Sequence, residues 1–539
     1  MKDSPKINLQ EIRELSSYEM GGLRIIPTNI IGVDDIDSPE DAEKVYKYIC
    51  DRLKLYKLDG LLLKIHDDFL NNQLPEYRNF IASMVKFVLH NSNMYGEFGS
   101  ISNEEFIDLL RLIISYELYD EEFDKEFKRE PKRAATSYLL KSVEQFQWNR
   151  NIRFMLSRTI FLYEELIKED LAPKFIKNVA DSKFKEKFGL TLRDFIKIGA
   201  VLWAGSSSHK GGLRRDYLEI ARKRGMTVPD DESVKICLRL IVCDPLQFRT
   251  DPLFRKYNIN PLLSRPLVRL WENSEIEEPF DDKFIAPIPD MIMYRITIGI
   301  YYQLYNIYGL EFATSFGDLF ELYVGKIING LRLPGRIIPE KDIDSYLPTK
   351  GNKGAKTRRP DWIIFSDKGV ILIECKAMHY TQDTFERGID AKNTGWLDQI
   401  RKSLDQFDKF EKRIPELCRK LGINYPELKV QRVIISFEPL LGLKKGPLRE
   451  FIDGKKRRDW MLLPIEDLEE IQPYIAKGYD LWTFASEYKN SLYEEFHNII
   501  KKMEDETGAS DSENMFHPFR TKILDDLLRD VERINKDSL

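Results

Sequence analysis

The sequence is poor in two metal-binding residue types, with 6 histidines and 5 cysteines among its 539 residues. It contains neither a Cys-x-x-Cys nor a His-x-x-x-His spacing, so a structural zinc site is not expected. The cysteines are odd in number and widely separated, which argues against a disulfide framework. They are Cys50, Cys237, Cys243, Cys375 and Cys418. We expect all five to be reduced core residues of a cytoplasmic protein.

The sequence also lacks a long apolar run. No segment approaches the roughly 20 apolar residues that a membrane-spanning helix needs, and the opening residues Met1–Pro5 contain no apolar signal core. An excess of one charge is lacking as well, because 83 Lys and Arg nearly balance 88 Asp and Glu, for a net charge of -5. These absences predict a soluble cytoplasmic protein without a membrane partner. They also argue against a histone-like nucleic-acid coat, so nucleic acid would have to be bound by local basic patches.

Apolar side chains are abundant, at 42% of the sequence, which is enough for well-packed domains. A chain of 539 residues is too long for one core, so we expect two or three domains. Periodicity is mainly helical in residues 1–285, where we predict a helical N-terminal domain. Prolines crowd residues 251–290, and we place the domain boundary near the end of that stretch. A second domain at 286–465 and a helical C-terminal extension at 466–539 would follow.

The stretch Arg358–Lys376 carries the strongest local signal. Two runs rich in β-branched and aromatic residues flank a polar segment, Ser366–Gly369, which is the pattern of an antiparallel hairpin. If those four residues form the loop, Asp361 lies opposite Glu374 on one face, with Cβ atoms roughly 5 Å apart. Lys376 projects from that same face, because side chains alternate along a strand. A bulge in the turn would instead shift the pairing by one residue.

The predicted cluster of Asp361, Glu374 and Lys376 has the composition of a metal site. Two carboxylates at such a short distance repel each other unless a cation lies between them. Carboxylate oxygens are ligands that suit Mg²⁺ or Mn²⁺. A cation there activates water and stabilises a phosphate oxyanion, while Lys376 orients the nucleophile or neutralises charge. The alternative is an exposed hairpin with ordinary surface charges. Against it, Val370–Ile373 is continuously apolar, which places the charges at the end of a buried strand.

In this order the residues resemble the PD-(D/E)xK nuclease superfamily, also called restriction-endonuclease-like. The pattern stands here as Pro360-Asp361 followed by Glu374-Cys375-Lys376. That family tends to carry a Glu on a helix before the hairpin, for which Glu321 is the candidate. The resemblance covers roughly residues 310 to 440 and leaves the N-terminal half unexplained. It implies that Asp361 and Glu374 bind Mg²⁺ or Mn²⁺, that Glu321 completes or supports the metal shell, and that Lys376 positions or activates the attacking water.

The predicted helix around Glu321 has a glycine one turn before it and another one turn after it, Gly317 and Gly325, on the same face. Each glycine costs roughly 0.5–1 kcal/mol in a helix interior relative to alanine. A metal site or a phosphate backbone approaching Glu321 would account for both glycines, and so would close helix packing. The apolar stripe of this helix is Phe316, Phe320, Val324, Ile327 and Ile328.

Candidate substrate contacts flank the hairpin on both sides. The segment 350–359 holds five cations, two glycines and no acid, and three of the cations lie closest to Asp361: Lys356, Arg358 and Arg359. Such a loop could grip a phosphate backbone. In the predicted helix Trp396–Leu421, some branches of the family carry a Gln followed by an aromatic residue, here Gln406 with Phe410, and Gln399 lies two turns earlier. The alternatives are a solvated loop and solvent-facing glutamines.

The predicted fold is mixed α and β, with a restriction-endonuclease-like domain around a central mixed sheet. The resemblance implies a magnesium-dependent nuclease acting on nucleic acid, with DNA favoured. Large single-chain nucleases with an unshared helical half resemble prokaryotic defence or restriction proteins. Two alternatives stay open, namely a nucleic-acid-binding module that does not cut, and a nuclease kept silent until a regulatory protein partner engages the helical N-terminal domain. A homodimer formed through the C-terminal tail is a further open alternative.

Overall fold

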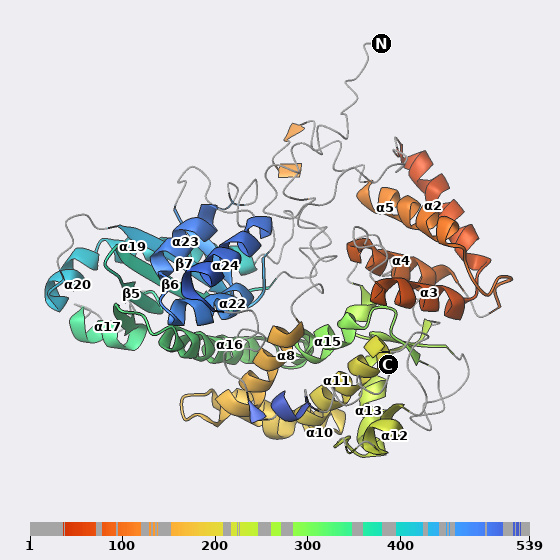
Figure 1. Ribbon diagram of the computed structural model, residues 1–539, viewed down its shortest axis with the longest axis horizontal. Coiled ribbons are helices and arrows are strands. Elements are labelled where there is room, and N and C mark those ends of the chain that lie inside the picture. Colours follow the sequence, from red (N-terminus) through yellow and green to blue (C-terminus); the bar gives the residue numbers. More distant parts are fainter. Residues whose placement is uncertain are drawn as a thin grey trace, which may run out of the picture. The chain divides into compact units, whose positions relative to one another are not determined.

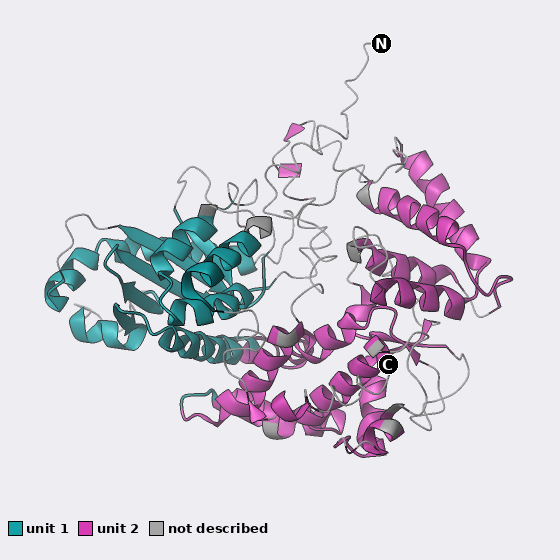
Figure 2. Ribbon diagram, in the orientation of Figure 1, with its two compact units in different colours: residues 1–27, 171–173, 313–518 teal, residues 28–170, 174–312, 519–539 magenta. Residues whose placement is uncertain are grey.

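The computed structural model shows two compact units, which are described separately (Figure 2). The structure describes residues 36, 38–71, 78–92, 95–119, 129–130, 133–134, 137, 152–208, 217–223, 225, 227–245, 260–270, 284–347, 359–379, 395–423, 429–440, 449, 452, 459–490, 493–509, 521–522, 524–527 and 529. Unit 1 comprises residues 1–27, 171–173 and 313–518, and unit 2 comprises 28–170, 174–312 and 519–539. The main division thus falls after residue 312 instead of 285, and the expected extension 466–539 is shared between both units.

Unit 2 consists mainly of helices (Figure 1). Its helices are α2 (Pro39–Lys54), α3 (Leu58–Leu70), α4 (Arg78–Asn91), α5 (Asn103–Leu118), α8 (Ile152–Ile160), η3 (Phe161–Glu165), η4 (Leu166–Lys168), α9 (Lys174–Asn178), η5 (Val179–Lys183), α10 (Phe184–Phe188), α11 (Leu192–Ser208), α12 (Tyr217–Lys223), α13 (Asp231–Ile241), η6 (Pro261–Leu263) and α15 (Asp290–Ile296). Its strands are β1 (Val242–Cys243), β2 (Leu267–Arg269) and β3 (Phe284–Ile285), which form a small mixed sheet in that order.

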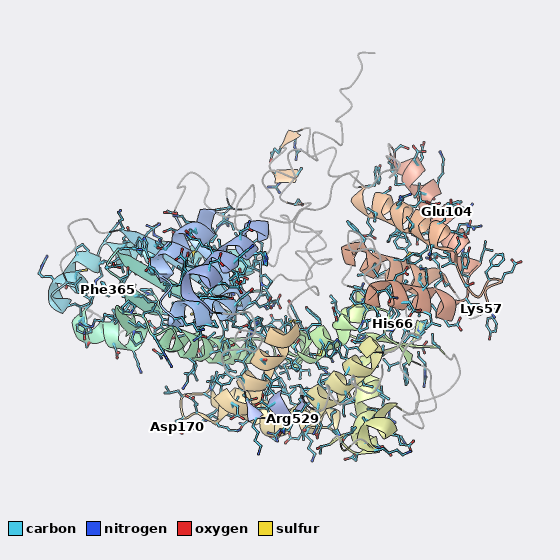
Figure 3. The ribbon with its side chains drawn as sticks, in the orientation of Figure 1. Lys57, His66, Glu104, Asp170, Phe365 and Arg529 are labelled. Atoms are coloured by element: carbon cyan, nitrogen blue, oxygen red, sulfur yellow. The ribbon has the colours of Figure 1, made fainter. Side chains whose placement is uncertain are left out.

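The core of unit 2 joins the helices to this sheet. Buried side chains of α2 to α5 form one cluster with residues of α15 and of the strands. His66 on α3 (Figure 3) is fully buried, and its Nδ1 donates to the carbonyl oxygen of Ala286, next to β3, at 2.7 Å. The helix starts follow ordinary capping rules, since the Ser38 hydroxyl accepts from the backbone N–H of Asp41 at 3.1 Å.

The long helix α16 (Ile298–Gly330) contains the division between the units. Gly309 interrupts its helical conformation with φ 59° and ψ -136°. Only glycine adopts this backbone region without steric cost, so the break is encoded by the residue itself. Pattern-based reading placed the boundary at the proline-rich segment because a single glycine inside an apolar helix is a weak signal.

Unit 1 is built around a five-stranded mixed sheet with the strand order β4-β5-β6-β7-β8. Its strands are β4 (Arg336–Pro339), β5 (Trp362–Phe365), β6 (Val370–Lys376), β7 (Val430–Ser436) and β8 (Met461–Pro464). Strand β5 is antiparallel to both β4 and β6, whereas β7 is parallel to β6 and β8 is parallel to β7. Phe365 pairs with Val370, which confirms the register predicted from a four-residue loop. The helices and the two mixed sheets agree with the coarse mixed α and β class.

Helices cover both faces of this sheet. Besides the end of α16, unit 1 contains α17 (Glu340–Tyr346), α19 (Gly395–Glu411), α20 (Ile414–Leu421), α22 (Ile465–Ala476), α23 (Leu481–Asn490) and α24 (Tyr493–Thr507). The single helix expected at 396–421 is therefore two helices, and Pro415 occupies the first turn of the second. Helix α19 packs on β6 and β7, and α16 packs its aromatic side chains edge-on against Phe437. In the described part of the chain, no helix combines the length and apolarity needed to cross a membrane.

Candidate active site

Three acidic residues align across the open end of strands β4, β5 and β6. Pro339 pairs with Trp362, and Trp362 pairs with Ile373. One residue further, the same register aligns Glu340 with Asp361 and Asp361 with Glu374. The backbone supports the first alignment, because the N–H of Glu340 donates to the carbonyl oxygen of Asp361 at 2.8 Å. The sheet thus brings together acids that are far apart in the sequence.

Asp361 ends the ladder between β5 and β6. Continuing the register places Pro360 opposite Cys375, and a proline has no N–H to offer the ladder. The Asp361 carboxylate itself accepts the backbone N–H of Cys375, at 2.7 Å. Ladder N–H groups lie in the plane of the sheet, so this carboxylate lies at the sheet edge and not on one face. Asp361 is only 8% exposed. From this position its carboxylate can contact side chains on either face of the sheet.

Helix α16 brings Glu321 to the same edge. The predicted apolar stripe anchors this helix, and its members are fully buried: Phe316, Phe320, Val324, Ile327 and Ile328. The two glycines differ in what surrounds them. A Cβ on Gly325 would come within 2.6 Å of the Trp362 ring, so close packing accounts for that glycine. A Cβ on Gly317 would meet no described atom within 4 Å, which leaves open space one turn from Glu321.

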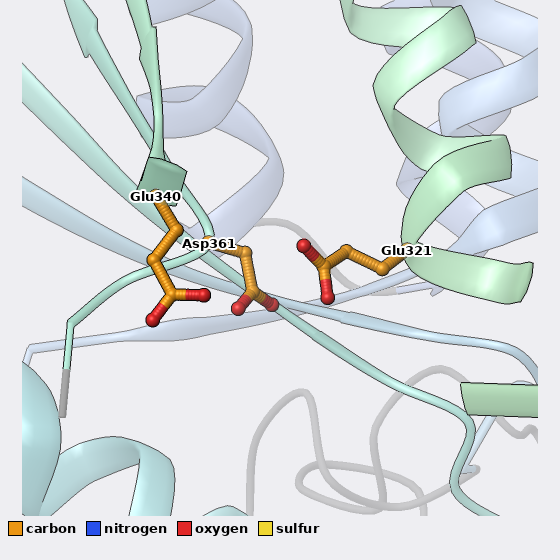
Figure 4. Close-up of side chains that lie close together, drawn as sticks. All are labelled: Glu321, Glu340 and Asp361. Carbon is orange, nitrogen blue, oxygen red and sulfur yellow. The ribbon is translucent and has the colours of Figure 1, made fainter. Parts of the chain in front are cut away.

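Figure 4 shows Asp361 between Glu321 and Glu340, with the three carboxylates converging. One oxygen from each lies within 4.8 Å of the other two. Burial is graded, because Asp361 is buried, Glu321 is half-buried and Glu340 is exposed. Carboxylate oxygens at this spacing suit a hard divalent cation, whose ligands lie about 2.0–2.6 Å from the ion. The donor set therefore fits Mg²⁺ or Mn²⁺, with access from solvent on the Glu340 side.

Glu374 is engaged differently from the other acids. One of its oxygens pairs with the Lys376 ammonium, and the other accepts from Gln406 Nε2 on α19 at 2.6 Å. Gln406 Nε2 also donates to the carbonyl oxygen of Arg359, so both of its amide hydrogens have acceptors. The expected ligand pair of Asp361 and Glu374 is thus not the set that converges here. Among the described residues, Asp361 is grouped with Glu321 and Glu340 instead.

The carboxyl pKa values of the site are raised, mainly by burial. Burial, reinforced by neighbouring acids, raises the pKa of Glu374 to about 8 and that of Glu321 to about 7. Burial also raises the pKa of Asp361 to about 6, even though Lys376 and the Cys375 N–H oppose that shift. For Lys376, burial favours the neutral amine, but Glu374 and Asp361 outweigh it and raise the ammonium's pKa. Burial is thus the largest cause of each raised carboxyl pKa, and a bound divalent cation would favour the ionised carboxylates.

The candidate substrate contacts have different outcomes. Lys356 and Arg358 lie outside the described residues. Arg359 is buried, pairs with Asp344 and donates to the carbonyl oxygen of Leu347 at 3.3 Å. Its guanidinium therefore connects α17 to the start of β5. The sequence had suggested a contact with a phosphate backbone, which this buried position does not offer.

The two glutamines of α19 also separate. Gln406 is buried and holds Glu374, so it reaches the site through another residue. Gln399 is half-buried and lies two turns away, and its backbone carbonyl accepts from the Ser403 hydroxyl at 2.9 Å. Among the described residues, no hydrogen bond joins the Gln399 side chain to the acids of the site.

Glu340 is the site residue that sequence reasoning missed. It follows the predicted strand Arg336–Pro339 directly, and it stands at the first position of α17. The pairing of that strand with β5 aligns Glu340 with Asp361. The signal was thus present in the register of the sheet and absent from any local motif.

Comparison with protein families, with curated proteins and with solved structures finds no match for this chain. The site's chemistry therefore has to be argued from its own residues.

Proposed function

We propose that the protein is a metal-dependent nuclease that hydrolyses phosphodiester bonds, with Mg²⁺ or Mn²⁺ as cofactor and DNA as the favoured substrate. One observation carries the proposal: the carboxylates of Glu321 on α16, Glu340 at the start of α17 and Asp361 next to β5 converge near the ion pair of Glu374 and Lys376. The order of helix, hairpin and glutamine-bearing helix also resembles the PD-(D/E)xK pattern. A role in prokaryotic defence or restriction is part of this proposal by analogy alone.

The chain's own residues have distinct tasks in this proposal. Asp361, Glu321 and Glu340 hold the cation, and Glu374 joins them when it leaves Gln406 and Lys376. When bound, the cation acts as a Lewis acid that stabilises negative charge on a phosphate and promotes ionisation of water. The Lys376 ammonium, beside these acids, orients the attacking water or neutralises charge on the phosphate. Burial of Asp361 and Glu374 limits bulk water around them, which strengthens these interactions.

The reaction balances without any further reactant. The oxygen of water forms a bond to phosphorus while one phosphorus–oxygen ester bond breaks. The two electrons of the broken bond leave with the ester oxygen, which takes up a proton, and the other product is a phosphomonoester. No oxidant or energy-rich cosubstrate is required.

A second candidate function is a nucleic-acid-binding or partner-regulated module that is silent by itself. The observation in its favour is the engagement of Glu374 by Lys376 and Gln406, away from the converging acids. A carboxylate held in this way does not contribute to a cation site until its partners release it. A protein partner of the helical unit 2 would then provide the trigger.

A cleavage assay with a matched variant tests the proposal. Full-length protein is incubated with plasmid, linear duplex, single-stranded DNA and RNA in Mg²⁺, Mn²⁺ or EDTA. We expect divalent-dependent cleavage that Asp361→Asn lowers by at least about 10²-fold. Asp367→Asn is the control, because Asp367 is an exposed carboxylate in the turn of the same hairpin.

The outcomes separate the two candidates. Cleavage that persists in EDTA, or that Asp361→Asn leaves intact, would contradict the nuclease assignment. Binding of a substrate without cleavage, measured by fluorescence polarisation, would favour the silent module. Cleavage that appears only after a cell extract is added would favour regulation by a partner.

A further inference from the structure

Ser436 is a buried hydroxyl next to Lys376. Strands β6 and β7 are parallel, and their register pairs Lys376 with Ser436. Both side chains therefore project from the same face of the sheet, on strands about 4.8 Å apart. Ser436 is 0% exposed, and its hydroxyl has no hydrogen-bond partner among the described residues. An unpaired buried hydroxyl is destabilising, so its presence in a strand that borders the site calls for a reason.

The surroundings of Ser436 leave Lys376 as its cross-strand polar neighbour. On the opposite side, β8 pairs Ser436 with Pro464, which has neither an N–H nor a polar side chain. Along β7, the preceding residue on this face is Ile434. Glu438 follows two residues later and is fully buried, and it makes no hydrogen bond to the Ser436 hydroxyl. The hydroxyl thus lies beside an ammonium that currently bonds elsewhere.

That ammonium has a partner which it is expected to lose. Lys376 pairs with Glu374. Glu374 is aligned with Asp361, which is one of the three converging carboxylates. Once Glu374 helps to hold a divalent cation, its charge is shared and its attraction for Lys376 falls. A half-buried ammonium needs an acceptor at that moment. The residue that β7 pairs directly with Lys376 is Ser436, whose hydroxyl can accept.

We propose that Ser436 is a positioning residue that accepts a hydrogen bond from the Lys376 ammonium when Glu374 turns to the cation. It thereby keeps the ammonium beside the phosphate to be cleaved. This inference rests on the proposed nuclease function and names one residue that the sequence motif does not contain. It also explains why the hydroxyl is unpaired in the cation-free protein.

The test compares two buried serines. Ser206 on α11 is likewise 0% exposed with no hydrogen-bond partner for its hydroxyl among the described residues, and it belongs to unit 2. In EDTA, we expect Ser436→Ala and Ser206→Ala to leave the Tm unchanged or higher, because neither hydroxyl has a partner to lose. In saturating Mg²⁺, we expect only Ser436→Ala to lower kcat, by about 10–100-fold, with KM changed less than about twofold. Ser436→Thr should retain activity that Ser436→Val loses, since these two side chains have the same shape and differ in the hydroxyl.

Each result decides the inference. A lower Tm of Ser436→Ala in EDTA would overturn it, since the hydroxyl would then have a partner in the resting protein. An unchanged kcat, or equal activities of Ser436→Thr and Ser436→Val, would also overturn it. If the wild type cleaves no substrate, the proposed function fails and the rise of Tm with Mg²⁺ decides the inference. We expect a smaller rise in Ser436→Ala than in Ser206→Ala, and equal rises would contradict the role of Ser436.

Discussion

The two ends of the β5–β6 hairpin carry the same kinds of charged residue in opposite settings. At the turn, Asp367 and Lys368 are exposed, and the Lys368 ammonium pairs with Asp480 at 2.5 Å, with both side chains partly open to water. At the open end, Asp361 and Glu374 are buried, and Glu374 pairs with the Lys376 ammonium.

The difference lies in burial and in the balance of charge. A solvent-exposed pair such as the one at the turn contributes little to stability and is screened by salt. At the open end, the carboxylates of Glu321, Glu340 and Asp361 converge, and among the described residues the Lys376 ammonium pairs with Glu374. Burying surplus negative charge is unfavourable, so folding alone would not select it. The proposed function, which recruits a divalent cation, would account for the arrangement.

The sharpest comparison uses the two lysines of the hairpin. Lys376→Met removes the ammonium beside the acids, and we expect nuclease activity to fall by about 10³-fold, because Glu374 loses its ammonium partner and the phosphate loses a positive charge. Lys368→Met removes the exposed lysine of the turn, and we expect activity within about twofold of the wild type. Initial rates of plasmid cleavage measure both variants. Similar losses in both would show that the two ends of the hairpin do not differ in the way described.

The second comparison concerns pH and stability. The pKa values of Asp361, Glu321 and Glu374 are raised to about 6, 7 and 8, so the folded state binds protons more tightly than the unfolded state does. The stability of the cation-free protein should therefore fall as the pH rises from about 4 to about 8. Thermal denaturation in EDTA should show a Tm lower at pH 8 than at pH 5.5 by about 5 °C or more. Mg²⁺ should remove most of that difference.

The turn provides the internal control for this experiment. Burial opposes the shift at Asp480, but hydrogen bonds from Lys368 and Thr483 lower its pKa below the ordinary value. The stabilisation that Asp480 contributes to the folded state is fully present at a pH above the ordinary pKa of an aspartate. It is lost only as the pH falls through the lowered pKa. Asp361→Asn should raise the Tm in EDTA at pH 8, and Asp480→Asn should not. A wild-type Tm in EDTA that rises steadily from pH 5.5 to pH 8 would contradict the surplus charge at the open end.

A third prediction concerns Glu340, the exposed member of the converging acids. Glu340→Gln removes one charged ligand without disturbing the core, and we expect the apparent affinity for Mg²⁺ to fall about tenfold. The maximal rate at saturating Mg²⁺ should change less. Titrations of activity against Mg²⁺ concentration distinguish the two effects. Asp342→Gln in the same short helix is the control, and an equal shift in both variants would count against a ligand role for Glu340.

The smallest expected effect distinguishes the two glutamines of α19. Gln406→Met leaves Glu374 and the carbonyl of Arg359 without a buried donor, so we expect a loss of about 1–3 kcal/mol in the free energy of unfolding. Gln399→Met, on the same helix and only half-buried, should cost less than about 0.5 kcal/mol. Urea denaturation of both variants measures the difference. Equal losses would mean that Gln406 does not hold Glu374 in solution.

Local patterns were sufficient to predict much of unit 1. The four-residue loop determined that Phe365 pairs with Val370, and the apolar stripe of α16 placed Glu321 on the correct helix. Both depend on short-range periodicity, which a sequence displays directly. Interruptions of helices were harder to predict. The apolar pattern continues past Pro415 and past Gly309, whereas the helical backbone conformation is interrupted near the first and at the second.

The arrangement within the site depended on contacts that local patterns do not contain. Glu340 and Asp361 are 21 positions apart in the sequence (361 − 340), and the pairing of β4 with β5 brings them together. The direction of the Glu374 side chain depends on Gln406, which comes from a helix beyond the hairpin. Arg359 looked like a phosphate contact because its neighbours are basic, yet burial against Asp344 gives it a structural task.

The most direct measurement is to locate Mn²⁺ in crystals of the protein by its anomalous scattering. The account predicts a peak bounded by carboxylate oxygens of Asp361, Glu321 and Glu340, with Glu374 turned toward it and away from Gln406. Loss of that peak in Asp361→Asn crystals would support the same conclusion. Well-diffracting crystals in millimolar Mn²⁺ with no peak at this edge of the sheet, or with Mn²⁺ bound only elsewhere, would contradict it.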